Sequence, residues 1–170
     1  YEEGDKRRDA SMVVTGGNAG NEVLVPLKAG NRVGGGGPSI NKWDFNKAEK
    51  ANEWQAKCGN RSSGMNYCVM RMSDAMLMLA EAKAYTGDNS GAVSLVNQVR
   101  ERAFGTARPI GNLSGEALLD AIWNERKLEL LGEGDIRWDM IRSGKFVERA
   151  FAARQEIADM ITGLETNGYY

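Results

Sequence analysis

Apolar residues recur with helical spacing through the middle of the chain, and they predict two neighbouring helices. Positions 69, 72, 76, 79 and 82 define one face of a helix over 69–86, which Gly87 ends as a C-terminal cap. Asp88 or Asn89 begins a second helix over 89–103, with 92, 96, 99 and 103 on its inward face. Because the connection is short, we expect the two helices to be antiparallel neighbours.

The same spacing predicts two more helices. Ser114 is a good N-cap for a third helix that runs to about 131, with 118, 119, 122, 123, 126 and 130 facing inward. Gly132 and Gly134 end it, and a shorter helix follows over 135–142. After Gly144 the pattern is mixed, and it predicts a helix near 147–154 followed by an extended tail.

Two consecutive helical hairpins suggest an α–α repeat of the tetratricopeptide type. Placing Leu79 and Ala80 at the Leu-Gly positions of that repeat puts Met76 at its first large site. The packing sites of the second helix then fall on Ala92, Val96 and Val99. Lys83 stands where an aromatic residue is expected, and a generic hairpin explains the pattern nearly as well. The expected fold class is mostly α, with tetratricopeptide-like hairpins and long irregular loops.

Residues 1–68 hold much of the glycine and few apolar runs, which predicts a loop-rich segment of a larger domain. Within it, 23–27 could be an edge strand because it contains Pro26, and 44–57 could be a short helix. The four glycines at 34–37 lack the following Lys-Ser/Thr of a phosphate loop and predict a flexible surface loop. The predicted division is therefore 1–68, paired helices over 69–144, and a tail over 145–170.

Charge and composition exclude several classes of function. The 22 basic and 23 acidic side chains give a net charge of −1, so we expect no nucleic-acid partner and no anionic membrane surface. The absence of histidine removes the commonest general base and zinc ligand, and we expect no metal or cofactor. Cys58 and Cys68 could form one disulfide or remain two free thiols. With neither an initiator Met nor a signal peptide, the chain is interpreted as cut from something longer.

Four strings in fixed order resemble motifs of one family. The first two strings lie at residues 71–82 and 97–103, and they are similar to the Arg-x-Ala-Asp-x-x-Leu-x-x-Ala-Glu-Ala and Leu-Asn-x-Val-Arg-x-Arg-Ala segments of the SusD/RagB family. The other two lie at 122–130 and 134–142, and they are similar to its Ile-x-x-Glu-Arg-x-x-Glu-Leu and Glu-Gly-x-Arg-x-x-Asp-Leu-x-Arg segments. The ending at 164–169 resembles the family's Asn-x-Gly-Tyr terminus in shortened form. Upstream, Asp5-x-Arg7 and Lys42-Trp43 loosely match its Asp-x-Arg and Lys-Tyr landmarks. Because these motifs belong to the family's C-terminal part, the chain resembles a C-terminal fragment.

The resemblance implies a function in nutrient capture. Proteins of this family are outer-membrane lipoproteins at the cell surface of Bacteroidetes, anchored through an N-terminal region that this chain lacks. They sit as a lid on a TonB-dependent transporter, the SusC-like barrel, and deliver oligosaccharides to it; some relatives deliver peptides. Their helices mostly build a scaffold, and the glycan sites usually lie in variable loops. The remaining N-terminal part of the same protein would then be a further partner.

Two carboxylates four residues apart, Glu125 and Glu129, are the first candidates for chemistry. They could share a proton or bind a metal, but the resemblance favours structural pairing with Arg126, Arg137 or Arg142. A buried network of this kind mainly sets helix orientation. Arg71, at the start of the first helix, is expected to pair with a carboxylate of the third helix. An enzyme such as a glycoside hydrolase is disfavoured, because two carboxylates on one helix face cannot flank a sugar from opposite sides.

Tryptophans in the loop-rich segment are the candidates for ligand binding. Trp54 and Trp43 could offer flat apolar surfaces to sugar rings, or they could cover the helical core. Nearby polar side chains could bond sugar hydroxyls, namely Asn41, Asn52 and Arg61. Trp123 and Trp138 lie on helices and are expected to pack, as is the methionine stripe at 70, 72, 76 and 78. A scaffold that contacts only the transporter is the alternative function.

Overall fold

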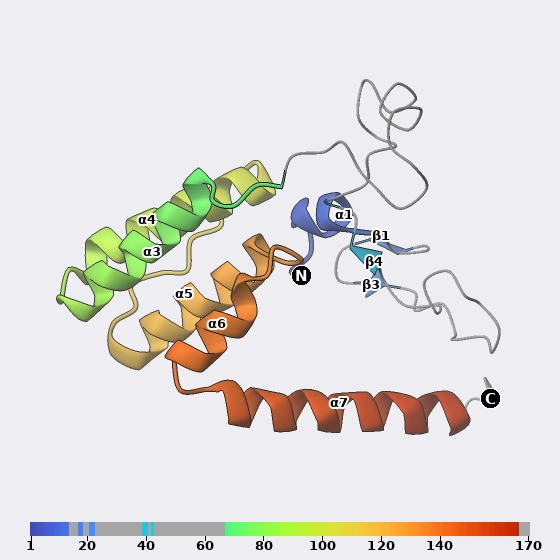
Figure 1. The fold of residues 1–170 in the computed structure, drawn as a ribbon. Coiled ribbons are helices and arrows are strands. Elements are labelled where there is room, and N and C mark those ends of the chain that lie inside the picture. Colours follow the sequence, from blue (N-terminus) through green and yellow to red (C-terminus); the bar gives the residue numbers. More distant parts are fainter. Residues whose placement is uncertain (14–16, 19–20, 23–38, 41, 43–66, 167–170) are drawn as a thin grey trace.

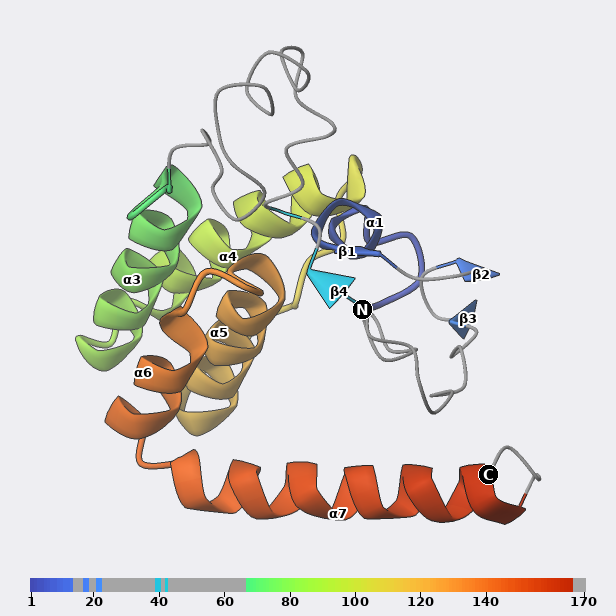
Figure 2. The ribbon, with the colours of Figure 1, turned by 45° about the vertical axis from the view of Figure 1, so that its right-hand side comes forward.

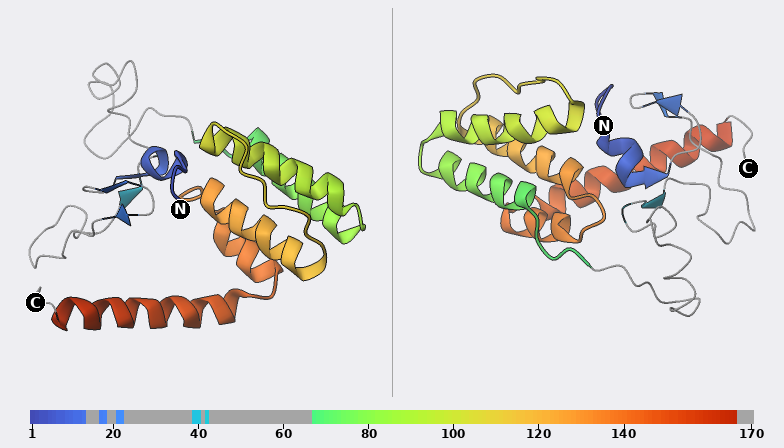
Figure 3. Two further views of the ribbon diagram at one scale, coloured as in Figure 1. Left: turned by 180° about the vertical axis from the view of Figure 1, so that it is seen from behind. Right: turned by 90° about the horizontal axis from the view of Figure 1, so that it is seen from above.

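The computed structural model describes residues 1–13, 17–18, 21–22, 39–40, 42 and 67–166. It confirms a mostly α fold. Two helical pairs form the main body, α3 (Met72–Tyr85) with α4 (Asn89–Phe104), and α5 (Gly115–Glu129) with α6 (Asp135–Arg142). Helix α7 (Phe146–Thr166) follows, and Figures 1 and 3 show it extending away from this body. The predicted division at residues 68 and 144 stays a prediction.

The first hairpin forms where the sequence predicts it. Gly87 has a φ of +87°, a conformation that side-chain-bearing residues rarely adopt, so it allows the chain to reverse after α3. The Asp88 carboxylate then accepts a hydrogen bond of 2.9 Å from the Gly91 backbone N–H and caps the start of α4. Helix α5 begins directly after Ser114, although no side-chain capping bond forms there.

The hydrophobic core lies where α3, α4 and α5 meet. Helix α4 contributes Ala92, Val96 and Val99 as predicted, with Val93 beside them. Helix α5 contributes Leu118 and Ile122, and α3 contributes Leu77 and Ala80. Because burying a Leu or Ile side chain contributes about 1.5–3 kcal/mol, this small cluster is a major source of stability for the hairpins.

The predicted inward face of α3 is wrong. Val69 and Met72 are 84% and 75% exposed, Leu79 is 49% exposed, and Leu77 and Ala80 are buried instead. The reason is that α3 carries apolar residues on both sides, so spacing alone could not choose between them. The buried side also holds Asp74 and Glu81, which meet arginines of α5 and α6.

Two packing predictions and one prediction of secondary structure are also wrong. The methionine stripe is largely exposed, with Met76 as its most buried member. Trp123 is buried, but Trp138 is 66% exposed, because α6 turns Asp139 and not Trp138 toward the bundle. The C-terminal tail is one helix from Phe146 to Thr166, whereas we expected a short helix and an extended end.

The N-terminal residues lie against the bundle. Helix α1 (Arg7–Ser11) leads into β1 (Met12–Val13), which pairs antiparallel with β4 (Ser39–Ile40). A second small ladder joins β2 (Gly17–Asn18) and β3 (Asn21–Glu22). Gly132, with a φ of +80°, brings the turn after α5 onto Ile40, where an added Cβ would lie 2.7 Å from Ile40 Cγ2. Figure 2 shows α1 and the β1–β4 ladder beside the end of α5.

Candidate functional site

Three carboxylates follow one another at four-residue intervals from the end of α5 into the next turn: Glu125, Glu129 and Glu133. This interval places side chains on the same side of a helix. Glu125 and Glu129 are only 1% and 2% exposed, which would be very costly without cationic partners. The cationic partners come from α1, from the start of α3 and from α4. Together with α5, four segments that are distant in the sequence therefore meet at these carboxylates.

Glu129 is bound by three arginines from different elements. Arg71, just before α3, and Arg102 of α4 both donate to Glu129 Oε1, the latter at 2.5 Å. Arg7 of α1 donates to Oε2 at 3.3 Å. Burial alone would raise the pKa of Glu129, but the hydrogen bond and charge of Arg71 hold it below its ordinary value. The carboxylate therefore stays ionised at neutral pH.

Glu125 is paired in the same way. It accepts from Arg7 Nη1 at 2.5 Å and from Arg100 Nη1 of α4 at 3.1 Å. Arg7 is in turn held by Asp5, whose Oδ2 accepts from Nη2 at 2.7 Å. Arg100 Nη2 donates to Glu2 Oε2 at 2.9 Å. We call this set the Glu129 cluster, and it consists of Asp5, Arg7, Lys42, Arg71, Arg100, Arg102, Glu125, Glu129 and Glu133.

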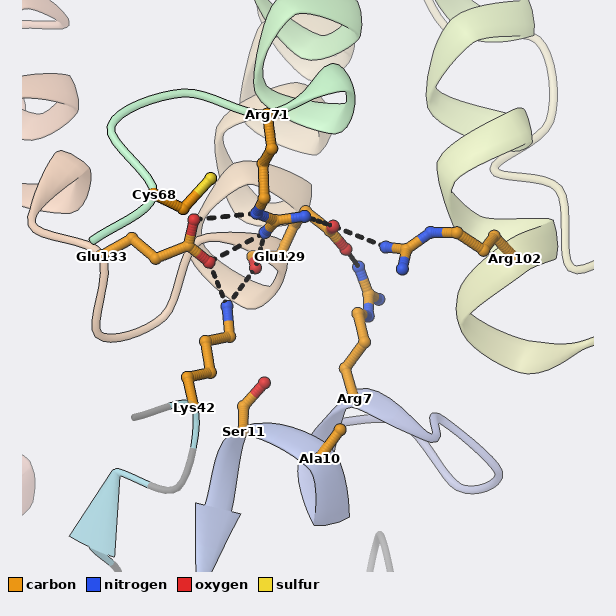
Figure 4. A pocket seen from close by; sticks show the side chains of 9 residues that line it. All are labelled: Arg7, Ala10, Ser11, Lys42, Cys68, Arg71, Arg102, Glu129 and Glu133. Atoms are coloured by element: carbon orange, nitrogen blue, oxygen red, sulfur yellow. Dashed lines mark hydrogen bonds and ion pairs between the residues drawn. The ribbon is translucent and has the colours of Figure 1, made fainter. Parts of the chain in front are cut away.

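A hollow of about 290 Å³ opens beside the Glu129 cluster, and Figure 4 shows the side chains that line it. Lys42 reaches in to donate to the Glu129 carbonyl oxygen at 2.6 Å and to the Glu133 carboxylate. Arg71 Nε donates to Glu133 Oε2 at 2.8 Å. Burial lowers the pKa of Lys42, with Glu133 opposing that effect. Cys68 is a free, exposed thiol at the rim, whereas Cys58 lies outside the described residues.

A second set, the Arg126 cluster, joins α3, α5 and α6. Arg126 donates to Asp74 Oδ1 and to Asp139 Oδ2, both at 2.7 Å. Arg142 donates to Asp139 Oδ1 at 2.9 Å and to Glu81 Oε2 at 2.6 Å. Because Arg126 and the three carboxylates are nearly fully buried, these bonds fix the orientation of the three helices.

The arrangement is suited to holding helices together and not to acid–base catalysis. Glu125 and Glu129 lie on the same side of one helix and point into arginines, so they do not face each other across a cleft. A carboxylate held ionised by several guanidinium groups is a poor proton donor near pH 7. Across the described part of the chain, no group of three or more Cys, Asp or Glu side chains is placed to hold a metal ion.

The predicted structural residues are only partly brought together. Arg71, Glu125, Arg126 and Glu129 all lie in the two clusters, and Arg71 meets Glu129 of the third helix. The partners of Glu125 are Arg7 and Arg100, not the arginines we expected. Arg137 is exposed, and within the described ranges it has no ion-pair partner. The predicted ligand residues all lie outside the described residues, namely Asn41, Trp43, Asn52, Trp54 and Arg61.

Sequence reasoning missed most of the basic residues of the Glu129 cluster, with Arg71 as the exception. Arg7, Lys42, Arg100 and Arg102 stand in segments that we matched to family landmarks but to which we gave no role. The sequence did contain a signal for these basic residues, because each of them stands at a fixed position in a family motif, which is Asp-x-Arg, Lys-Trp or Arg-x-Arg. What was missing was knowledge that these segments converge on α5.

The family model described as the SusD family matches residues 1–169, nearly the whole chain. The chain belongs to the SusD family. Among curated proteins, SusD-like protein P38 of Formosa agariphila is 39% identical over 90 residues, which make up 49% of this chain and 18% of that protein. SusD-like protein P25 of the same organism is 35% identical over 107 residues, 60% of this chain and 20% of the relative.

A third relative, SusD-like protein P2 of Formosa agariphila, is 38% identical over 99 residues, 54% of this chain and 19% of that protein. The chain thus spans about a fifth of the length of the curated SusD-like relatives it matches. No solved structure shows a significant match to it. Among the described helices, none is both long enough and apolar enough to cross a bilayer.

Proposed function

We propose that this protein captures nutrient oligosaccharides at the bacterial cell surface and passes them to a TonB-dependent transporter of the outer membrane. Membership of the SusD family over residues 1–169 is the observation that carries the proposal. On this proposal the protein is a lipid-anchored surface protein of the outer membrane, and it binds its ligand without transforming it.

The two ion-pair clusters support a division of labour between scaffold and binding surface. Their buried carboxylates are occupied by arginines, which leaves them unavailable for sugar hydroxyls. A rigid support of this kind lowers the entropic cost of holding binding loops in one geometry. We therefore propose that ligand contact comes from the loop-rich segment, through Trp54 and Trp43 as stacking surfaces and Asn41, Asn52 and Arg61 as hydrogen-bonding groups.

Native gel electrophoresis through embedded polysaccharides tests this proposal. The full chain and its Trp54→Ala variant would be run through gels containing a panel of neutral and acidic polysaccharides. The chain is expected to be retarded by at least one of them, and Trp54→Ala should lose that retardation, because an indole face stacked on a sugar is worth about 1–3 kcal/mol by analogy with base stacking. Trp138→Ala is the matched control, since Trp138 is an exposed indole on α6.

Two outcomes would contradict the proposal. If no polysaccharide retards the chain, these residues do not capture glycans. If Trp54→Ala binds as well as the unaltered chain while Trp138→Ala does not, the stacking surface lies on the bundle and the proposed loop residues are wrong.

A scaffold that only contacts the transporter is the second candidate. The observation that favours it is that the charged groups in both clusters are already paired with one another. Affinity purification from the native outer membrane distinguishes the two candidates. Each of the five proposed sugar-binding residues would be substituted in turn. If a barrel partner co-purifies with every variant and the gels detect no glycan binding, the result supports a scaffold. Peptide delivery would instead require retention of the chain on immobilised peptides.

A further inference from the structure

Glu133 lies in the turn between α5 and α6, and it binds the residues on both sides of the segment 43–66. Lys42, which precedes this segment, donates to the Glu133 carboxylate and, at 2.6 Å, to the Glu129 carbonyl oxygen. Tyr67, which follows the segment, donates its hydroxyl to the Glu133 carbonyl oxygen at 2.5 Å. A single residue of the bundle therefore fixes the chain before and after 43–66.

The turn around Glu133 touches the same two sides of the segment. Before it, Ile40 of β4 lies against Gly132. After it, the Tyr67 hydroxyl oxygen lies 3.8 Å from the position where a Cβ would stand on Gly134. The small residues next to Glu133 thus allow the chain on both sides of 43–66 to approach the turn closely.

Arg71 holds the Glu133 carboxylate in place. Its Nε donates to Oε2 at 2.8 Å and its Nη2 donates to Oε1 at 2.9 Å, which is a two-point, charge-assisted geometry. Figure 4 shows Arg71 and Lys42 approaching this carboxylate from opposite sides, and the Glu133 side chain is only 8% exposed. The carboxylate thus separates two cations that would otherwise repel each other. We call Lys42, Tyr67, Arg71 and Glu133 the Glu133 anchor.

The segment between the two anchored residues carries most of the groups proposed above to bind ligand. Holding the two ends of a segment at one place lowers its conformational entropy before any ligand arrives. Less entropy is then lost on binding, and the affinity is higher. The proposed groups within the segment are Trp43, Asn52, Trp54 and Arg61, and Asn41 directly precedes Lys42.

We propose that Glu133 is a positioning residue for ligand binding, because it holds both ends of 43–66 through Lys42 and Tyr67. This inference rests on the proposed function, since Glu133 acts on ligand only through the segment that it holds. The role differs from packing of the bundle. The Arg126 cluster and the hydrophobic core join the helices without Lys42 or Tyr67.

Hydrogen exchange of the full chain without ligand tests the anchor directly. Lys42→Met and Tyr67→Phe should each speed amide exchange in 43–66 by roughly 3- to 10-fold, the effect of losing one hydrogen bond that closes the segment. Exchange in α4 should not change. Lys145→Met is the matched control, because the Lys145 side chain is 19% exposed, against 18% for Lys42, and it bonds Asp120 at 2.5 Å.

Equal exchange in 43–66 for the wild type and both anchor variants would overturn the proposal. So would a wild-type segment that exchanges as fast as an unfolded chain, because nothing would then be held. An equal acceleration in Lys145→Met would show a general loosening of the protein and would also contradict a specific role of the anchor.

Affinity gels with a polysaccharide that retards the wild type test the link to ligand binding. Lys42→Met should bind roughly 3- to 10-fold more weakly, because ligand must then order one end of the segment. Lys42→Arg keeps the cation and should recover most of the loss, and Lys145→Met should bind like the wild type. Circular dichroism would establish that each variant keeps its helices.

A double variant tests whether Lys42 acts through Glu133. Lys42→Met combined with Glu133→Gln should bind no more weakly than Glu133→Gln alone, because both changes remove the same contact. Losses that multiply would overturn the proposal, as would Lys42→Met binding as tightly as the wild type, in which case the proposed function would still stand. If no polysaccharide binds the wild type, the proposed function is wrong, and the exchange measurement alone supports or rejects the anchor.

Discussion

The helical bundle α3–α6 and helix α7 are built from similar sequence patterns but differ in what holds them. In the bundle, apolar positions and paired charges from distant segments are buried together. From Phe146 to Asp159 in α7, every side chain is exposed except Arg149, which is partly buried. Both regions are helical. The difference shows that periodicity forms a helix, whereas its placement here depends on partners from elsewhere in the chain.

The bundle and α7 differ most clearly in their buried charged side chains. In the bundle, Asp74 and Asp139 are matched by Arg126, and these pairs join three helices. In α7, the bond between Gln155 and Asp159 joins residues one turn apart and holds nothing else. Breaking contacts in the two regions should therefore have very different consequences for the free energy of unfolding.

The largest expected effect comes from removing Arg126. Arg126→Met would leave the Asp74 carboxylate buried without its cation and Asp139 with Arg142 alone. We expect a loss of about 3–5 kcal/mol in the free energy of unfolding, because an uncompensated buried charge remains. Urea denaturation followed by circular dichroism measures it. A loss below about 1 kcal/mol would show that the Arg126 cluster does not hold the helices together.

Acid should weaken the bundle through the same carboxylates. The pKa values of Glu129 and Glu133 lie below their usual 4.5 in the folded protein, in spite of burial, because Arg71 and Lys42 bind them. Their stabilisation is thus complete above about pH 4.5 and is lost as the pH falls through the lower folded pKa values. Urea midpoints at pH 7, 4.5 and 3 measure the loss.

Glu129→Gln is the control for that acid dependence. The variant should be less stable at pH 7 and should lose less stability between pH 4.5 and 3, because one of the titrating groups is gone. An unchanged slope in the variant would mean that carboxylates outside the Glu129 cluster cause the acid sensitivity.

The sequence predicted where the helices of the bundle begin and end far better than it predicted which of their faces are buried. The bounds and the inward face of α4 followed from apolar spacing and from Gly87 and Asp88. The bounds of α6 followed from the glycines at 132, 134 and 144. The inward face of α3 did not, because apolar residues occupy both of its sides and the buried ones are accompanied by Asp74 and Glu81. Which side of such a helix is buried depends on where Arg126 and Arg142 stand, and a single helix does not contain that information.

The candidate site shows the same limit. Glu125 and Glu129 were recognised as a pair because they are four residues apart in one helix. Their partner Arg7 is more than a hundred residues away and comes from a segment with no regular apolar pattern. Sequence reasoning therefore identified Glu125, Glu129 and Arg71. The three-dimensional fold was needed to identify the other members of the Glu129 cluster.

A modest core substitution should still distinguish the two regions. Ile122→Val removes one methylene from a fully buried side chain in α5, at a site packed between α3 and α4. We expect a loss of about 0.5–1.5 kcal/mol, from the lost transfer energy and a small residual cavity. Thermal unfolding of the two chains side by side measures the difference.

The smallest effect should come from the matching change in α7. Ile157→Val removes the same methylene from a side chain that is 54% exposed. Because it creates no cavity, the loss should stay within about 0.5 kcal/mol, the range of ordinary surface substitutions. If Ile157→Val instead costs as much as Ile122→Val, then Ile157 is buried in solution. The contrast between a packed bundle and an unpacked C-terminal helix would then fail, and a surface that covers α7 would have to be sought.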